Sequence, residues 1–512
     1  MTRRGTTKCI FALLIVFVYK APNSSAQEME RKWRILHITD IHLDMQYVEG
    51  AEVACAAPPC CRRRTSQDAS DFEFSSDNLP EFPARSFGEY TCDSPPQLLQ
   101  SALDAARQAH PDIVIWGGDT APHEAAGRKG APAGATSLGE RLDAARARVR
   151  ASLAAATTLF HTMFPNTPVL PQLGNHDFAM GAMNEAPLGG GWMTQLAADL
   201  WKQWLPPSAL RTLEWGGYYE HRPVPGLRVA VLNTEVCHIQ NMHAFVDGGE
   251  AARLQLRWLE SVLRGAQNDA ETVLVTGHIP PGTWSGCWGN YSAEYEAVVA
   301  RYAAVVAGQL FGHQHSGSFR MMRSPSHPHI NAYGVAFVTP SLAPFLHQNP
   351  SFRFYDVAGS PSAIQHFEQY FLNLGSVDPG NQGGPLLWSP GFVPRSALGL
   401  SDLSPNAWQG VLNRMWNNET FAIAYRAAEA NGRDWMALKG ANNGDIRDYL
   451  CALTGITDNE YQTCTGKSEE VMIRQYTGSV HTYVLTALFP FHVIMDHFHH
   501  VLSGIRPEDW DA

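Results

Sequence analysis

The stretch Gly174-Asn175-His176-Asp177 decides the fold, because it follows directly after the apolar run Val169–Leu173. A short apolar run bounded by turn-forming residues is typical of a buried strand. Four further motifs of this kind also follow apolar runs, and they are, in chain order, Asp40-Ile41-His42, Gly118-Asp119, Gly277-His278 and Gly312-His313-Gln314-His315. Any one motif alone is explained by a polar side chain that caps a helix or bonds loop backbone. Five of them in order, each after a strand, indicate a shared site.

The apolar runs predict six buried strands, at Trp33–Ile38, Ile113–Trp116, Val169–Leu173, Leu227–Leu232, Val273–Thr276 and Gln309–Phe311. Helical stretches lie between them. The clearest is Leu138–Phe160, where Ser137 and Glu140 have the spacing of a capping box. This alternation predicts an α/β layered fold with functional residues at the strand ends.

The residue types in the five motifs suit a pair of metal ions. Two divalent cations roughly 3.5–4 Å apart need a bridging anion and nitrogen or oxygen ligands around them. Asp119 is the natural bridge. The remaining candidates divide into Asp40, His42 and His315 for one ion, and Asn175, His278 and His313 for the other. His313 and His315 alternate with Gln314, so an extended segment would direct both imidazoles the same way. The glycines before the ligands would let the backbone approach the metals without a side-chain clash.

Composition limits the class of protein. The chain has 512 residues, of which 45% are hydrophobic and 17% charged, as in an ordinary globular enzyme. A formal charge of −11 argues against nucleic-acid binding, since proteins that track a phosphate backbone normally present a basic stripe. We therefore exclude a nucleic-acid scaffold role.

The five motifs resemble those of the calcineurin-like metallophosphoesterases and, within them, the acid sphingomyelinase and acid sphingomyelinase-like phosphodiesterase family. The resemblance extends from about Trp33 to the cysteines near the C-terminus. It is carried further by three stretches, Asp119-Thr-Ala-Pro-His123, Gly277-His-Ile-Pro-Pro-Gly282, and Tyr47-Val-Glu-Gly followed by Cys55, Cys60-Cys61-Arg62-Arg63 and Cys92-Asp93.

The resemblance implies a β-sandwich flanked by helices, two zinc ions, and hydrolysis of a phosphodiester by water activated between the ions. Zinc is taken from the family, because the same ligands would also suit manganese or iron. His176 and His123 match the family's catalytic histidines that do not bind metal, and they could donate a proton to the leaving group. A surface position is the alternative for His123. Asp177 either orients His176 or caps a helix.

The N-terminus resembles a secretory signal peptide, with Arg3, Arg4 and Lys8 before the apolar run Ile10–Tyr19. An uncleaved anchor is the weaker alternative. Removal of residues 1–26 leaves eight cysteines, an even number suited to disulfides in an oxidising compartment. By resemblance to the family these pair as Cys55–Cys60, Cys61–Cys92, Cys237–Cys287 and Cys451–Cys464. Asn290 and Asn418 begin glycosylation sequences. We expect a secreted, extracellular or lysosomal protein.

We expect three regions: the signal peptide at 1–26, a catalytic domain at 27–375, and a linker with a helical C-terminal domain at 376–512. The stretch Glu49–Pro96 is predicted to be a long, disulfide-stapled loop, and Gly375–Gly399 a linker or wrapping segment. The apolar stretch Val484–Met495 is interrupted by Pro490, which argues against a membrane-spanning helix and leaves a shallow peripheral contact as an option. A cluster beyond it, Asp496, His497, His499 and His500, is interpreted as a solvated helix face.

We predict that the substrate is sphingomyelin, which would yield ceramide and phosphocholine, and nucleotide phosphodiesters are the alternative. Acid sphingomyelinase carries a saposin module before its catalytic domain, whereas few residues separate Ala26 from Trp33. We therefore expect no such module here, as in the sphingomyelinase-like members, although the spacing of Cys55 to Cys61 is closer to sphingomyelinase. A secreted binding protein without catalysis is the alternative of a different class. The oligomeric state is not predicted.

Overall fold

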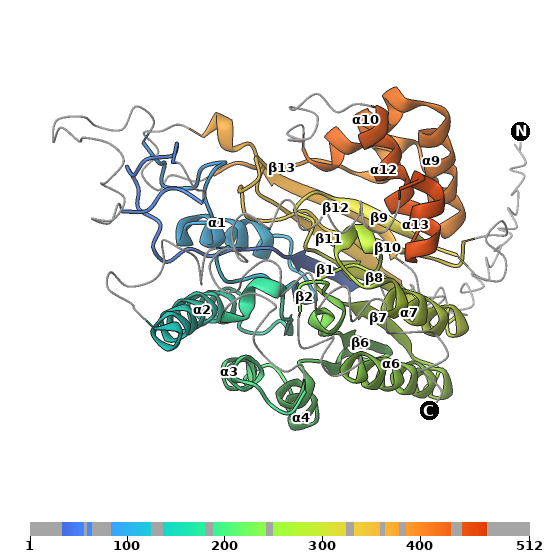
Figure 1. The fold of residues 1–512 in the computed structure, drawn as a ribbon, viewed down its shortest axis with the longest axis horizontal. Helices are drawn as coiled ribbons and strands as arrows, with labels where there is room; N and C mark the ends of the chain where they lie inside the picture. Colours follow the sequence, from blue (N-terminus) through green and yellow to red (C-terminus); the bar gives the residue numbers. More distant parts are fainter. Residues whose placement is uncertain are drawn as a thin grey trace, which may run out of the picture.

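Two six-stranded sheets form the centre of the fold (Figure 1). The structure is a computed structural model that describes residues 33–55, 59–63, 83–123, 137–179, 188–241, 249–323, 332–358, 364–377, 386–431 and 443–467. The first sheet has the order β13-β12-β11-β1-β2-β3 and the second the order β5-β6-β7-β8-β10-β9. Their strands are β1 Trp33–Ile38, β2 Ile113–Trp116, β3 Val169–Pro171, β5 Tyr219–Val224, β6 Leu227–Val231, β7 Thr272–Thr276, β8 Val306–Phe311, β9 Ser318–Met322, β10 Gly334–Val338, β11 Ser351–Val357, β12 Ile364–Leu372 and β13 Trp388–Pro390.

All six predicted strands are present, with ends that agree to within three residues. Strands β1, β2 and β3 run parallel, as do β6, β7 and β8. Parallel strands covered on both faces are built from continuous apolar runs, which is why these six were visible in the sequence. Five of the strands that were not predicted, β5, β9, β11, β12 and β13, pair antiparallel with their neighbours. The sixth, β10, was missed although it pairs parallel with β8.

The two sheets face each other across a shared apolar core. Phe337 of β10 in the second sheet packs on Phe367 and Tyr355 in the first, with ring centroids 5.4 and 6.1 Å apart. Helices α1 (Pro96–Arg107) and α2 (Leu138–Met163) pack against the first sheet, and α6 (Glu250–Asp269) and α7 (Gly289–Arg301) against the second (Figure 1). The predicted β-sandwich flanked by helices is therefore confirmed.

The predicted helix at Leu138–Phe160 is confirmed as α2, which continues to Met163. Ser137 and Glu140 form the expected capping box, in which each side chain binds the other residue's backbone N–H. Helices α3 (Trp192–Trp201) and α4 (Pro207–Gly216) follow and pack against each other.

The C-terminal part of the described chain is helical, as predicted from about Ser404. It comprises α9 (Pro405–Asn417), α10 (Glu419–Glu429), α12 (Asn443–Thr454) and α13 (Asp458–Thr465). Trp408 of α9 is fully buried against Phe319 and Phe337 of the second sheet. Glu429 at the end of α10 forms a buried ion pair with Arg353 of β11. Through these contacts the C-terminal helices share a core with the sheets.

The segment Gly375–Gly399 is predicted to be a linker or wrapping segment, and the structure adds secondary structure to it. It contains β13, which adds an antiparallel edge to β12, and the short helix α8 (Pro394–Leu398). Strand β13 was not predicted because it is only three residues long and follows a Gly- and Pro-rich stretch, which is typical of loops. The nitrogen of the Trp388 indole donates a hydrogen bond to Ser101 of α1, which ties this edge to the helical layer.

All four predicted disulfides are present. Asn290 in the first turn of α7 and Asn418 at the start of α10 are exposed, which keeps both open as glycosylation sites. The predicted signal peptide, the stretch Val484–Met495 and the cluster at 496–500 lie outside the described residues. Within the described part of the chain, no helix combines the length and the hydropathy needed to cross a membrane.

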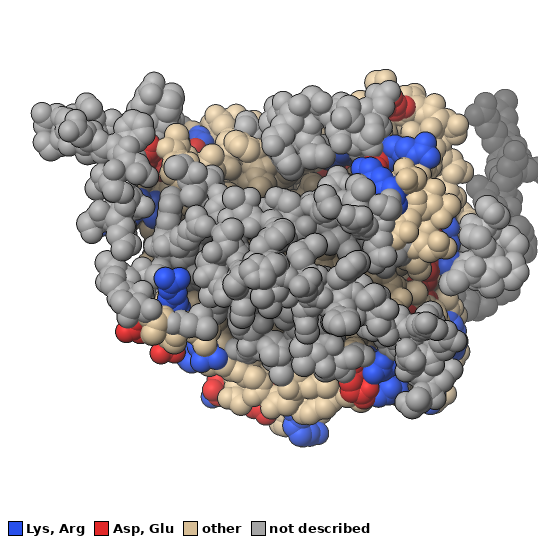
Figure 2. All heavy atoms as spheres, viewed as in Figure 1, with Lys and Arg blue, Asp and Glu red and all other residues tan. Residues whose placement is uncertain are grey.

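Charges of both signs are interspersed on the described residues of the face shown in Figure 2. Both blue and red side chains occur along the lower edge of this view. On the described residues of this face, such a mixture does not form the basic stripe expected of a protein that tracks nucleic acid.

Candidate metal centre

The five motifs meet at one edge of the two sheets. Asp40 and His42 follow β1, Asp119 follows β2, and Asn175 with His176 forms a short 3-10 turn after β3. His278 follows β7, and His313 and His315 follow β8. Because β1, β2 and β3 are parallel, and so are β7 and β8, their carboxyl ends emerge together and bring these residues into reach of one another.

Asp119 lies at the centre of this site. Its Oδ2 is 3.0 Å from Nε2 of His278 and 3.7 Å from Nε2 of His42. Its side chain takes part in two groups of potential ligand atoms that lie within 4.8 Å of one another, one with Asp40 and His42 and the other with His278 and His313. A carboxylate shared by two groups in this way is the geometry expected of a bridge between two ions.

The backbone at the site is strained. Asp40, His42, Asp119, His313 and His315 all have positive φ, between 44° and 72°. Each such residue costs about 1–2 kcal/mol, and strain of this kind collects at functional sites. The expectation that His313 and His315 belong to an extended segment is therefore wrong. Both still reach the site, His313 beside His278 and His315 beside His42, with 3.1 Å between the Nε2 atoms of His42 and His315.

Two glycines permit this close approach. A Cβ on Gly174 would lie 2.2 Å from the backbone nitrogen of Asp119, and one on Gly312 would lie 2.6 Å from Oδ2 of Asp40. The prediction that glycines precede the ligands for steric reasons is confirmed at both positions.

Hydrogen bonds orient the histidine rings. Nδ1 of His42 lies 3.0 Å from the carbonyl oxygen of Ala121, and Nδ1 of His278 lies 2.8 Å from that of Gly117. A ring nitrogen that faces a carbonyl carries the proton, so Nε2 is the atom of each ring that is directed at the site. Burial opposes the charged form of His278, but Asp119 and Asp40 more than offset it and raise its pKa to about 10, so a metal would replace a proton on Nε2 of that ring. Burial also lowers the pKa of His42 and His313, and lowers that of His315 to about 3, which keeps these rings neutral. Neutral imidazole is the form that binds metal.

The donor set fits a pair of divalent cations. Burial raises the pKa of Asp40 to about 7, with His278 acting in the opposite direction. Burial also opposes ionisation of Asp119, but His278 and His176 more than offset it and hold its pKa well below the ordinary value. Oδ1 of Asn175 is buried and has no hydrogen-bond partner among the described residues. Closely packed carboxylates, neutral imidazoles and an orphaned amide oxygen are costly in a dry site and are compensated by bound cations.

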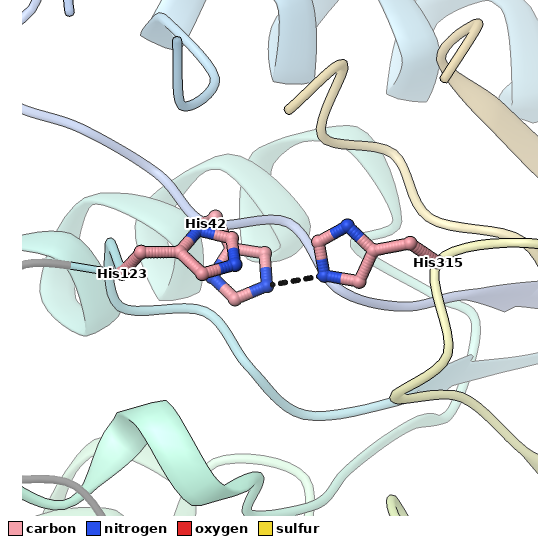
Figure 3. A group of neighbouring side chains, drawn as sticks. All are labelled: His42, His123 and His315. Carbon is pink, nitrogen blue, oxygen red and sulfur yellow. Dashed lines mark hydrogen bonds between the residues drawn. The ribbon is translucent and has the colours of Figure 1, made fainter. Parts of the chain in front are cut away.

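The two predicted catalytic histidines border this site. The ring of His123 stacks on His42 at a centroid distance of 3.7 Å and lies 4.7 Å from that of His176. Figure 3 shows His123 against His42, with His315 on the far side. One nitrogen of His123 also lies within 4.8 Å of nitrogens of His42 and His315. The surface alternative for His123 is therefore wrong, because its side chain is only 16% exposed and is part of the site.

Asp177 does not bind His176. Its Oδ1 accepts hydrogen bonds from the backbone nitrogens of Thr120 and Ala121, and its Oδ2 accepts one from Gly174. Asp177 is also not the N-cap that the alternative predicted, because it is the third residue of the 3-10 turn and binds the backbone of the N-cap residue, Gly174. Asp177 fixes the β2 and β3 exits relative to each other.

Two buried polar residues near the site were not predicted. Glu235 and His238 follow β6, a sixth strand exit that lacks the Gly-Asp or Gly-His pattern. The Glu235 carboxyl has no hydrogen-bond partner among the described residues, and its Oε1 is 3.9 Å from Nδ1 of His238. Burial, reinforced by the charge of Asp119, raises the pKa of Glu235 to about 8. A search for any polar residue after an apolar run could have found this pair.

Comparison with known proteins agrees with the geometry. Residues 34–317, more than half of the chain, match the calcineurin-like phosphoesterase family. The chain belongs to this family. Its fold is accordingly the calcineurin-like phosphoesterase fold, which implies a dinuclear metal site, and the clustered Asp and His side chains lie where that site is expected.

Relatives within the family are sphingomyelinase-like. The chain is 33% identical over 396 residues to the sphingomyelin phosphodiesterase of Homo sapiens, and the aligned region covers 75% of this chain and 57% of that protein. It is 30% identical over 475 residues to the acid sphingomyelinase-like phosphodiesterase 3b of Mus musculus, and that aligned region covers 88% of this chain and 93% of the mouse protein. The chain thus spans a little over half the length of the human sphingomyelin phosphodiesterase and nearly all of the mouse protein. It is a member of the sphingomyelinase-like phosphodiesterases.

Proposed function

We propose that this chain is a zinc-dependent phosphodiesterase, secreted or lysosomal, that hydrolyses sphingomyelin to ceramide and phosphocholine. The observation that carries the proposal is the position of Asp119, whose carboxylate is shared by two groups of metal-ligating side chains. Asp40, His42 and His315 would hold one ion, Asn175, His278 and His313 the other, and Asp119 both. Imidazole-rich sites of this kind suit zinc.

Each side chain has a role in the reaction. When bound, a pair of divalent cations lowers the pKa of a water molecule and neutralises phosphoryl oxygens. The leaving oxygen still needs a proton. His123 and His176 are placed to supply it, because their rings lie 4.7 Å apart beside the ligand His42. Of the two, His176 also supports the centre through its backbone nitrogen, which donates to Oδ1 of Asp119 at 2.7 Å.

Apolar surface beside the site favours a lipid substrate over a nucleotide. Phe345 lies 4.5 Å from the ring of His123, and the next residue, Leu346, is 41% exposed. Met45, three residues after His42, is 46% exposed. Exposed apolar side chains that follow site residues this closely in the chain would offer the chains of a lipid a partial escape from water, at about 25 cal/mol per Å² of buried area. The names of the sphingomyelin phosphodiesterase relatives point the same way.

The compartment and the membrane contact are parts of the same proposal. Four disulfides are stable in an oxidising compartment, which supports export. The stretch Val484–Met495 is proposed to make a shallow peripheral contact with the bilayer that presents the lipid.

Turnover across a panel of diesters tests the substrate. We expect sphingomyelin dispersed in detergent to be cleaved faster than sphingomyelin in neutral vesicles. The control is Asp119→Asn, which removes the bridging charge and should abolish turnover of every diester. Nucleotide diesters cleaved orders of magnitude faster, with dispersed sphingomyelin left intact, would refute the lipid assignment and leave a nucleotide phosphodiesterase. Partner binding without turnover of any diester by metal-loaded protein would favour the catalytically silent binding protein.

A further inference from the structure

Asp93 holds His123 by two hydrogen bonds. Oδ1 of Asp93 lies 2.6 Å from Nδ1 of the His123 ring, and Oδ2 accepts a hydrogen bond from the backbone nitrogen of His123 at 3.0 Å. Asp93 itself is fully buried. Both oxygens of one carboxylate are therefore committed to one residue, which fixes the backbone and the ring of His123 together.

This contact decides which nitrogen of His123 faces the chemistry. A carboxylate accepts the Nδ1 proton, so Nε2 is the ring atom left for the substrate. The ring cannot easily turn away, because it stacks on His42 at 3.7 Å and meets Phe345 at 4.5 Å. A carboxylate that orients a catalytic imidazole in this way is a recurrent device in enzymes.

The disulfide-stapled loop, Glu49–Pro96, holds Asp93 in place. Cys92, the preceding residue, is joined by a disulfide to Cys61. Ser94, the following residue, donates its N–H to the carbonyl oxygen of His42 at 3.0 Å. Asp93 is thus fixed on one side to the disulfide and on the other to the backbone of a metal-ligand candidate.

The same loop supplies a counter-charge. Arg62, next to Cys61, has its Nη2 atom 3.8 Å from Oδ2 of Asp93 and donates a hydrogen bond through Nε to Asp44 at 2.6 Å. One guanidinium therefore serves two buried carboxylates, Asp44 and Asp93. The Cys61–Cys92 bond ties the chain segment that carries the cation to the segment that carries the anion.

We propose that Asp93 is a positioning residue for proton transfer by His123, and that the disulfide-stapled loop serves to hold it there. This inference rests on the proposed phosphodiesterase function. His123 enters the step doubly protonated, with one proton on Nδ1 and a second, taken from solvent, on Nε2. As the bond between phosphorus and the leaving oxygen breaks, its electron pair goes to that oxygen, and the Nε2 proton of His123 moves to it. The neutral ring that remains keeps its other proton on Nδ1, bonded to Asp93. A proton from solvent, equal to the one that the attacking water loses, restores the ring.

The test is Asp93→Asn assayed on two substrates that differ in the leaving group. The amide has one acceptor oxygen in place of two, so one of the two bonds to His123 is lost and the ring can take the wrong tautomer. Sphingomyelin loses an alkoxide, which needs the proton, whereas bis(4-nitrophenyl) phosphate loses a phenolate that leaves without one. We expect kcat for dispersed sphingomyelin to fall about a hundredfold and that for the nitrophenyl ester to stay within about twofold, with metal content unchanged.

The matched control is Asp44→Asn, the other carboxylate on Arg62, which does not bind His123. Any loss in that variant is expected to be equal for the two substrates. Equal losses in Asp93→Asn would show that Asp93 is merely structural and would overturn the inference alone. An unmodified protein that cleaved neither substrate would instead refute the proposed function, and this inference with it.

Two further measurements test the inference even if the Asp93→Asn variant alone is poorly stable. In a His123→Ala background, Asp93→Asn is expected to cause no further loss of sphingomyelin turnover, and multiplied losses would contradict the inference. Nitrogen NMR of the unmodified protein is the second measurement. The imidazole signal of His123 is identified as the one that disappears in His123→Ala, and it is expected to show a proton on Nδ1. A proton on Nε2 with Nδ1 bare would overturn it.

Discussion

Nε2 of His278 lies 3.0 Å from Oδ2 of Asp119, and the two side chains come from different sheets. Asp119 follows β2 of the first sheet and His278 follows β7 of the second. Both are buried, and Nδ1 of His278 is occupied by the carbonyl of Gly117. The contact therefore joins the two halves of the sandwich at the site where a pair of cations is expected.

Chelation followed by re-addition of metal tests that expectation. Removal of metal is expected to abolish diesterase turnover, because the buried carboxylates and imidazoles around Asp119 are arranged to hold cations. Zinc is expected to restore turnover. The measurement is metal content per chain alongside activity, with magnesium as the comparison ion. Full turnover by a chain shown to contain no metal would refute the two-metal site.

His176→Ala is expected to lower kcat by about a hundredfold or more while both metal ions stay bound. The fall in kcat follows from loss of the imidazole proposed to donate a proton. The metal ions should stay bound because the backbone nitrogen of His176 donates to Oδ1 of Asp119 at 2.7 Å, and alanine keeps that hydrogen bond. Metal analysis and kcat on the same preparation check this. Loss of both metals with the activity would mean instead that the imidazole is a ligand.

The sequence was most informative where structure is local. Strand exits such as Gly174-Asn175 and Gly312-His313 lie beside their apolar runs, so the clustering of these residues and six of the strands could be predicted. Arg353 shows the limit, because it is fully buried within β11 and balanced by Glu429, 76 residues away. The sequence around Arg353 does not indicate that Glu429 is its partner. A charged residue within an apolar run argues against a buried strand, so β11 was not predicted. The role of Asp93 toward His123 likewise depends on folding and not on spacing.

Stability should depend on pH through Glu296, which lies in α7 and is not among the candidate metal ligands. Burial raises its pKa from 4.5 to about 7, with a smaller opposing effect from the backbone N–H of Arg323. The folded chain therefore prefers the neutral acid. Its contribution to stability is fully present below pH 4.5 and is lost as the pH rises through about 7.

Glu296→Gln is expected to remove this pH dependence, because an amide oxygen can still accept the 2.8 Å hydrogen bond from Arg323. The free energy of unfolding of the variant minus that of the unmodified chain should increase between pH 4.5 and 7, by at most about 1.4 kcal/mol per pH unit. Urea titrations across this range provide the measurement. Glu294→Gln on the exposed face of the same helix is the control. A constant difference between variant and parent at all pH values would contradict the assignment.

The last prediction concerns the apolar surface beside the site, and Leu346 allows it to be tested separately from the chemistry. Leu346 is 41% exposed and adjoins Phe345, whose ring contacts His123. Leu346→Gln keeps the size and the unbranched Cβ that suit its φ of 66° but removes apolar surface. We expect a severalfold slower turnover of sphingomyelin in vesicles, since the lipid chains lose a contact of about 25 cal/mol per Å². Turnover of bis(4-nitrophenyl) phosphate should not change.

Leu387→Gln is the matched control, because Leu387 is the more exposed leucine, at 80%, and precedes the edge strand β13. If both glutamine variants slowed vesicle turnover alike, general loss of surface hydrophobicity would explain the effect. If Leu346→Gln left vesicle turnover intact, the surface beside His123 would have no part in lipid recognition, and the argument for sphingomyelin over nucleotides would rest on the relatives alone.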